Sequence, residues 1–147
     1  VGYQNVEDGW RSIVERAMTR DALAVWNLPG GIVKITEIKE KWGGLRVHWE
    51  GGDMPDDAAA RVREAIELAE FRSYCTCRQC GSEGKTYEHD GWILTLCSVH
   101  ERGRAVHDQE EPLLTRYRFE AGGTIKTVCR LRYDRDRDIF VPLPPLP

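Results

Sequence analysis

Two short pairs of potential metal ligands constrain this 147-residue chain more than any other feature of its sequence. Cys77 and Cys80 are separated by two residues, as are Cys97 and His100, and residues 81–96 connect the two pairs. Two ligands at this spacing can hold one metal ion from a single turn, and the distance between the pairs is typical of structural zinc sites. Three thiolates and one imidazole complete a tetrahedron and leave no open position for water. The pattern therefore predicts a closed, structural Zn²⁺ site.

Two other uses of the cysteines remain open at the level of the sequence. The Cys77-x2-Cys80 spacing also serves thiol–disulfide exchange, although a helix normally follows there and "GSEGK" follows here. A disulfide among Cys75, Cys77 and Cys80 is disfavoured, because they are too close together to bridge comfortably and the chain is expected to be cytoplasmic. Cys75 is predicted to stay outside the metal site. Cys129, on an apolar strand face, is predicted to lie in the core.

Hydrophobic periodicity and turn residues predict the elements around this site. Apolar residues recur at helical spacing in some segments, whereas others are β-branched or alternate between apolar and polar residues and are separated by glycines. The expected helices are residues 8–26, 53–73 and 98–109. The expected hairpins reverse at Gly43-Gly44, near His89-Asp90-Gly91 and at Gly122-Gly123. The proline-rich end is expected to be extended and to lie at a sheet edge, since proline lacks a backbone N–H.

These elements together predict an α+β fold in a single domain, residues 1–147. A helix-and-β-hairpin core (1–73) is followed by a treble-clef-like zinc element (74–109), and a C-terminal β-hairpin with a proline-rich tail (110–147) completes the chain. The second ligand pair is expected to start the helix at 98–109, which is the feature that would make the element a treble clef.

A net charge of −3 argues against binding nucleic acid through overall charge. The C-terminal hairpin nevertheless interleaves arginine with tyrosine, and arginines that contact phosphates beside aromatic rings that stack on bases would suit a nucleic-acid surface. The candidate residues of that surface are Arg116, Arg118, Arg130, Arg132, Tyr117 and Tyr133. No apolar run approaches the roughly 18–20 residues that span a bilayer, so no membrane partner is expected.

Two phrases, "IKEKWGGLRVHW" and "CRQCG…GWILTLCSVH", together resemble a group of small, mostly uncharacterised proteins from phages, prophages and bacteria. That group combines a KEKxGGLR strand–turn–strand, a helix and a C-x2-C-G…G-W-x-x-T-L-C-x-x-H zinc element, and the resemblance covers about residues 37–104. The ligands that it implies are Cys77, Cys80, Cys97 and His100, with Trp92 packed beside them. The turn motif falls on Lys39, Glu40, Gly43, Gly44, Leu45 and Arg46. The resemblance implies a zinc-binding, phage-borne protein and assigns no activity.

The sequence therefore favours a zinc-stabilised, non-enzymatic binding protein, which as a phage or prophage accessory protein would engage a host protein complex in the host cytoplasm. The nucleic-acid-binding surface is the alternative. A third, less favoured class is an HNH-like metal-dependent nuclease, which would need His89 or His107 as general base and a second metal ion. The short connection 81–96 leaves little room for the loop of such enzymes, and Glu101 rather than histidine follows His100.

Overall fold

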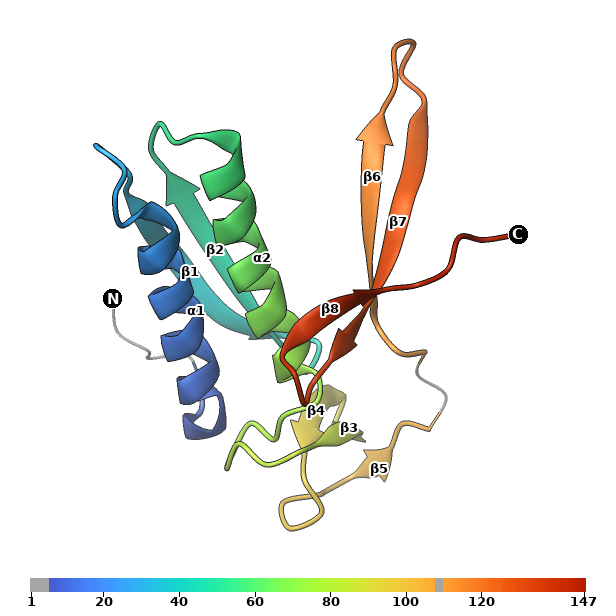
Figure 1. Cartoon of the computed structure of the whole chain (residues 1–147). Helices are drawn as coiled ribbons and strands as arrows, with labels where there is room; N and C mark the ends of the chain where they lie inside the picture. Colours follow the sequence, from blue (N-terminus) through green and yellow to red (C-terminus); the bar gives the residue numbers. More distant parts are fainter. Residues whose placement is uncertain (1–5, 108–109) are drawn as a thin grey trace. The chain divides into compact units, whose positions relative to one another are not determined.

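The computed structural model describes residues 6–107 and 110–147, which form an α+β fold, as the sequence predicts (Figure 1). The chain divides into two compact units, Val1–His107 and Asp108–Pro147. Within the described ranges, the first unit holds two α-helices and two small sheets, and the second holds one three-stranded sheet. The prediction of a single domain stays a prediction. No helix in the described part of the chain is long and apolar enough to cross a membrane.

The first unit begins with a short 3-10 turn, η1 (Asp8–Trp10), which leads directly into helix α1 (Arg11–Val25). The apolar stripe predicted for this segment faces the interior, with Trp10, Ile13 and Val14 almost completely buried. Helical periodicity thus aligns the large apolar side chains of this segment on the face that contacts the rest of the unit.

A β-hairpin follows, formed by strands β1 (Val33–Lys41) and β2 (Gly44–Gly51). Its turn is made by Trp42 and Gly43, with φ angles of 55° and 77°. Two central residues with positive φ are the type I′ arrangement that matches the twist of the strands. The predicted reversal at Gly43-Gly44 is therefore one residue out of register, because Gly44 already opens β2.

Helix α2 (Asp56–Ser73) lies beside α1, and the two helices cover one face of the β1–β2 hairpin (Figure 1). From the hairpin, Leu45 and Val47 point into the same core, as their alternation with polar residues predicts. The stripe predicted for the second helix is entirely buried and consists of Ala58, Val62, Ala65, Ile66 and Ala69. Helices and hairpin thus share one apolar core.

The second sheet contains strands β3 (Lys85–His89), β4 (Trp92–Leu96) and β5 (Arg104–Ala105) in the order β4-β3-β5. Strands β3 and β4 form the hairpin expected between the two ligand pairs. Asp90 and Gly91 make its turn with φ angles of 50° and 80°, again a type I′ reversal.

The helix predicted for residues 98–109 is wrong over the residues that the structure describes; residues 108–109 lie outside them. The chain forms a turn at 98–100 and then adds β5 to the free edge of β3. Gly103 explains the difference: its φ is 75°, and a Cβ at this position would clash with the carbonyl oxygen of Glu88. The ligand pairs and the hairpin of the predicted treble clef are present, but the helix is replaced by a strand.

The second unit is a sheet of strands β6 (Leu113–Phe119), β7 (Ile125–Asp134) and β8 (Ile139–Pro142) in the order β6-β7-β8. The turn between β6 and β7 contains Gly122 and Gly123, as predicted, and both have positive φ. Strand β8 comes from the proline-rich tail and occupies an edge, which is the place that residues without a backbone N–H can take.

Candidate metal centre

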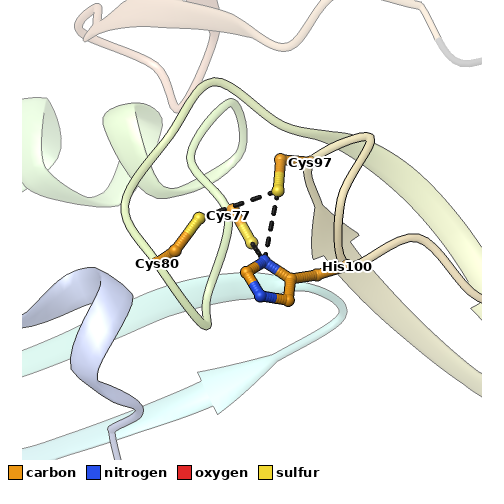
Figure 2. Close-up of side chains that lie close together, drawn as sticks. All are labelled: Cys77, Cys80, Cys97 and His100. Atoms are coloured by element: carbon orange, nitrogen blue, oxygen red, sulfur yellow. Dashed lines mark hydrogen bonds between the residues drawn. The ribbon is translucent and has the colours of Figure 1, made fainter.

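Four side chains from the two ligand pairs converge on one point (Figure 2). The ligand atoms of Cys77, Cys80, Cys97 and His100 all lie within 4.8 Å of one another. His100 Nδ1 is 3.2 Å from Cys97 Sγ and 3.7 Å from Cys77 Sγ, and the sulfurs of Cys80 and Cys97 are 3.6 Å apart. The residues singled out by their spacing thus form a Cys3His group that could hold a metal ion.

The Cys80–Cys97, Cys97–His100 and Cys77–His100 separations are close to the edges of a zinc tetrahedron. Zn–S bonds of about 2.3 Å and a Zn–N bond of about 2.0 Å imply edges of about 3.8 Å between sulfurs and about 3.5 Å between sulfur and nitrogen. The observed 3.6 Å and 3.2–3.7 Å agree to within a few tenths of an ångström. The sulfurs are too far apart for a disulfide bond of about 2.05 Å, and all five cysteines are free.

Each ligand pair is held in a tight backbone turn. In the first, the Cys77 amide donates to the Ser82 carbonyl at 2.7 Å, and the Gly81 amide donates to the Cys77 carbonyl at 2.9 Å. Gly81 has a φ of 83°, a conformation that favours glycine. In the second turn the His100 amide donates to the Cys97 carbonyl at 3.1 Å. These turns hold the two ligands of each pair close together in the folded chain.

The thiols of the two turns differ in acidity. Hydrogen bonds from the side chain and the backbone of Ser82 lower the pKa of the Cys80 thiol to about 6. Burial raises the pKa of Cys97, and the amide hydrogen bonds of His100 and Val99 oppose that rise. A bound divalent cation would favour the thiolate of both residues, so metal binding would release protons.

The remaining cysteines lie outside this group. Cys75 is half-buried just after α2, and its thiol donates a hydrogen bond to the carbonyl of Arg72 at 3.3 Å. Cys129 lies in β7 of the second unit and is also half-buried rather than enclosed in a core. Neither thiol adds a ligand to the four that converge.

Polar contacts attach the metal centre to the helix–hairpin core. The Thr95 hydroxyl, in β4, donates to the carbonyl of Gly43 at 2.7 Å, and this hydrogen bond is buried. Arg78, between the first two cysteines, forms ion pairs with Glu40 at 2.8 Å and with Glu7 at 2.7 Å. The contacts of Gly43 and Glu40 join the "IKEKWGGLRVHW" segment to the "CRQCG…GWILTLCSVH" segment, which contains the cysteines. The two segments on which the resemblance is based therefore contact each other in the folded chain.

The other residues of the turn motif also have structural roles. A Cβ on Gly44 would lie 2.4 Å from the ring of Tyr74, so only glycine fits there without a shift of that ring. The Leu45 amide donates to the Ser73 hydroxyl at 2.8 Å, and the Arg46 guanidinium lies 5.4 Å from the centre of the Tyr74 ring. The motif therefore fastens the hairpin to the end of α2.

The expectation that Trp92 packs beside the ligands is wrong, because its side chain is 71% exposed. It follows the Asp90-Gly91 turn, where the end of the β3–β4 hairpin meets solvent. Trp42, in the turn of the other hairpin, is equally exposed at 71%. Both tryptophans line one groove of about 1020 Å³ between the two hairpin turns. Trp42 has no role predicted from the sequence, although its place before a glycine in a tight hairpin turn could have indicated exposure.

The arginines and tyrosines of the proposed nucleic-acid surface are divided between the two faces of the second unit. The residues directly paired across β6 and β7 share a face, and this pairing places Arg116 and Arg118 on one face and Arg130 and Arg132 on the other. Tyr117 is 60% exposed, whereas Tyr133 is buried and its hydroxyl donates to Asp138. The six residues are therefore not gathered in one place, and the nucleic-acid surface stays a prediction.

Comparison with known protein families, with curated proteins and with solved structures finds no match for this chain. The resemblance to phage and prophage proteins accordingly stays a prediction, and the assignment of the site depends on its geometry alone.

The two histidines considered as the general base of a nuclease lie outside the candidate metal centre. His89 pairs with Asp90 at 3.3 Å in the hairpin turn, and neither His89 nor His107 belongs to the Cys3His group.

Proposed function

We propose that this chain is a zinc-stabilised, non-enzymatic binding protein that engages a protein partner. The observation that carries the proposal is the convergence of the Cys3His group, whose Cys80–Cys97, Cys97–His100 and Cys77–His100 separations are close to the edges of a zinc tetrahedron. Thiolates and imidazole in a tetrahedral arrangement favour zinc over hard cations, which prefer oxygen ligands. With four protein ligands the ion would have no open position for water or substrate. It would therefore contribute folding energy rather than chemistry.

The groove between Trp42 and Trp92 supports the binding role. A tryptophan with positive φ is strained, at a cost of about 1–2 kcal/mol, and exposure denies Trp42 the burial that would offset it. The stability of the free chain therefore does not account for Trp42. Tryptophan is among the residues that contribute most at the centres of protein–protein interfaces. A partner that buries both rings would explain why both are exposed in the free chain.

The charges of the groove favour an acidic partner segment. Lys41 and Arg102 line it, and within residues 6–107 and 110–147 neither forms an ion pair. The other ionisable side chains of the groove already have partners, as Lys39–Glu37, Arg78–Glu40 and His89–Asp90. Two free cations beside two aromatic rings are complementary to a peptide segment that carries acidic and apolar side chains. If the chain is phage-borne, as the resemblance implies, it would meet this partner in the host cytoplasm.

The zinc assignment is tested by measuring the metal content of the purified protein. We expect about one zinc ion per chain, since one Cys3His group fills one tetrahedron. Cys77→Ser and Cys97→Ser should lose it, while Cys75→Ser should retain it because Cys75 lies outside the group. A wild-type chain without zinc, prepared in zinc-supplemented medium, would contradict the assignment.

The binding surface is tested by affinity capture from host extract with matched tryptophan variants. Trp42→Ala and Trp92→Ala should each lose the captured partner. Trp26→Ala should keep it, because Trp26 is 78% exposed but does not line the groove. A parallel titration with a single-stranded oligonucleotide addresses the alternative function. Salt-dependent oligonucleotide binding that survives both groove substitutions would favour the nucleic-acid surface instead.

A further inference from the structure

A cavity of about 740 Å³ lies between α1 and β1 and shares no lining residue with the groove or the metal centre. Its walls are largely apolar and include Met18, Val25, Val33 and Ile35. Asp21 is its acidic lining residue. Cavities that bind small ligands typically measure about 300–1,000 Å³ and combine apolar walls with a few placed polar groups.

Asp21 is buried in this setting because of its place in the helix. It falls between Ala17 and Ala24 on the buried stripe of α1, so the helix turns its side chain inward. The residue is 3% exposed, and neither carboxylate oxygen has a hydrogen-bond partner within the described parts of the chain. Buried carboxylates are almost always paired, so an unpaired one calls for an explanation.

Two basic residues near the cavity leave this carboxylate unpaired. Lys34 lines the same cavity from β1, but its side chain is exposed and it forms no ion pair with Asp21 among the described residues. Arg61, on the helix packed against α1, donates instead to Asp57 at 3.1 Å and to the carbonyl of Ala24 at 3.4 Å. Within the described parts of the chain, therefore, no basic side chain neutralises this acid.

The free chain gains no stability from an acid at this position. Burial raises the pKa of Asp21 from 3.8 to about 7, so an ionised carboxylate is held in apolar surroundings above neutral pH. An alanine or leucine at the same place would bury apolar area without that desolvation cost. Residues that lower stability without a structural return are concentrated at sites of function.

We propose that this cavity binds a ligand with a cationic nitrogen on an apolar body, and that Asp21 is its counter-ion. An amidinium, guanidinium or primary ammonium group would donate to both carboxylate oxygens, while the apolar part packs against Met18 and Val25. Pairing removes the cost of the isolated buried charge, so ligand binding stabilises the fold. The site is independent of the tryptophan groove and of the proposed function.

Isothermal titration calorimetry at pH 8 tests the site with benzamidine as the probe and benzamide as its neutral counterpart. The wild-type chain should bind benzamidine in preference to benzamide. Asp21→Asn should bind benzamidine more weakly by on the order of tenfold or more, because a charged hydrogen bond is lost. Glu15→Gln removes an exposed acid from the same helix and should bind as the wild type does. Circular dichroism checks that both variants keep their fold.

A second arm separates a free small cation from an arginine side chain of a partner protein. Its probes are the end-blocked peptide Ala-Leu-Arg-Leu-Ala and the same peptide with citrulline in place of arginine. Tighter binding of benzamidine assigns the cavity to a small cation, and tighter binding of the arginine peptide assigns it to a protein side chain. If the wild type and Asp21→Asn bind both probes equally, or if neither probe binds the wild type at millimolar concentration, the proposal is overturned.

Discussion

The first unit contains two apolar clusters that differ in how much their buried side chains can contribute to the stability of the fold. The larger joins α1, α2 and the β1–β2 hairpin around side chains such as Trp10. The smaller lies beside the Cys3His group, in residues 76–105, which we call the metal element. Apart from Cys77 and Cys97, it consists of Tyr87, Leu94 and Leu96 together with half-buried Ala105. Fully burying a large apolar side chain contributes about 1.5–3 kcal/mol, whereas ordering the backbone costs about 1–2 kcal/mol per residue. We therefore expect the smaller cluster to depend on a bound metal ion for its stability and the larger to be stable without one.

Removing the metal should separate the two clusters, and this is the largest effect that we expect. Chelation, or Cys77→Ser, should unfold residues 76–105 while α1, α2 and the β1–β2 hairpin persist. Hydrogen exchange measures this directly: the amides of β3 and β4 should lose protection, and those of both helices should keep most of theirs. Cys75→Ser is the control and should exchange as the wild type does. Continued protection of β3 and β4 in the chelated protein would show that the smaller cluster stands without metal.

The parts of the structure that could be predicted from the sequence are those that depend on local patterns. The helices and the inward face of β2 follow from periodicity, which depends only on local geometry and on burial. The four ligands follow from spacing, because one tetrahedron allows few arrangements of short-spaced pairs. The replacement of the helix after His100 by β5 depends on the close approach of Gly103 to Glu88, which is a tertiary contact. Spacing and periodicity carry no information about contacts of that kind.

Two further features could not be predicted from the sequence, because they too depend on tertiary contacts. The groove exists because two hairpin turns distant in sequence lie together, so neither Trp42 nor Trp92 reveals it alone. The acid at position 21 was visible as an interruption of an apolar stripe between Ala17 and Ala24. Whether that interruption is an exposed residue or a buried unpaired charge depends on what β1 places opposite it.

The second largest effect concerns the buried acid within the larger cluster. Because the folded-state pKa of Asp21 is raised from 3.8 to about 7, ionisation of this group costs the fold nothing below pH 4, and the wild-type chain loses stability as pH rises through 7. The free energy of unfolding of Asp21→Asn minus that of the wild type should therefore be larger at pH 8 than at pH 4, by on the order of 2–4 kcal/mol. Urea titrations of both proteins at the two pH values measure the change. A difference between variant and wild type that stays constant with pH would show that Asp21 finds a partner in solution.

The contact between the two clusters should have a smaller effect. Thr95→Val removes the hydroxyl that donates to the Gly43 carbonyl and leaves that buried oxygen without its hydrogen bond. We expect a loss of about 1–2 kcal/mol. Thr86→Val is a matched control, since Thr86 pairs with Thr95 across the same hairpin. Thermal unfolding of the zinc-loaded variants compares them, and equal losses in both would mean that the contact does not couple the clusters.

The smallest expected effect is a gain, and it lies at the turn where the larger cluster meets the metal element. Trp42→Gly should stabilise the free chain by about 1 kcal/mol, because glycine adopts positive φ without strain and little burial is lost. Trp92→Gly is the contrasting substitution: Trp92 begins strand β4 and is not among the residues with positive φ, so glycine there should destabilise the hairpin. Chemical denaturation of both variants gives the two signs. If Trp42→Gly also destabilises, the ring contributes to the packing of the free chain, and no partner is needed to explain why tryptophan stands at this position.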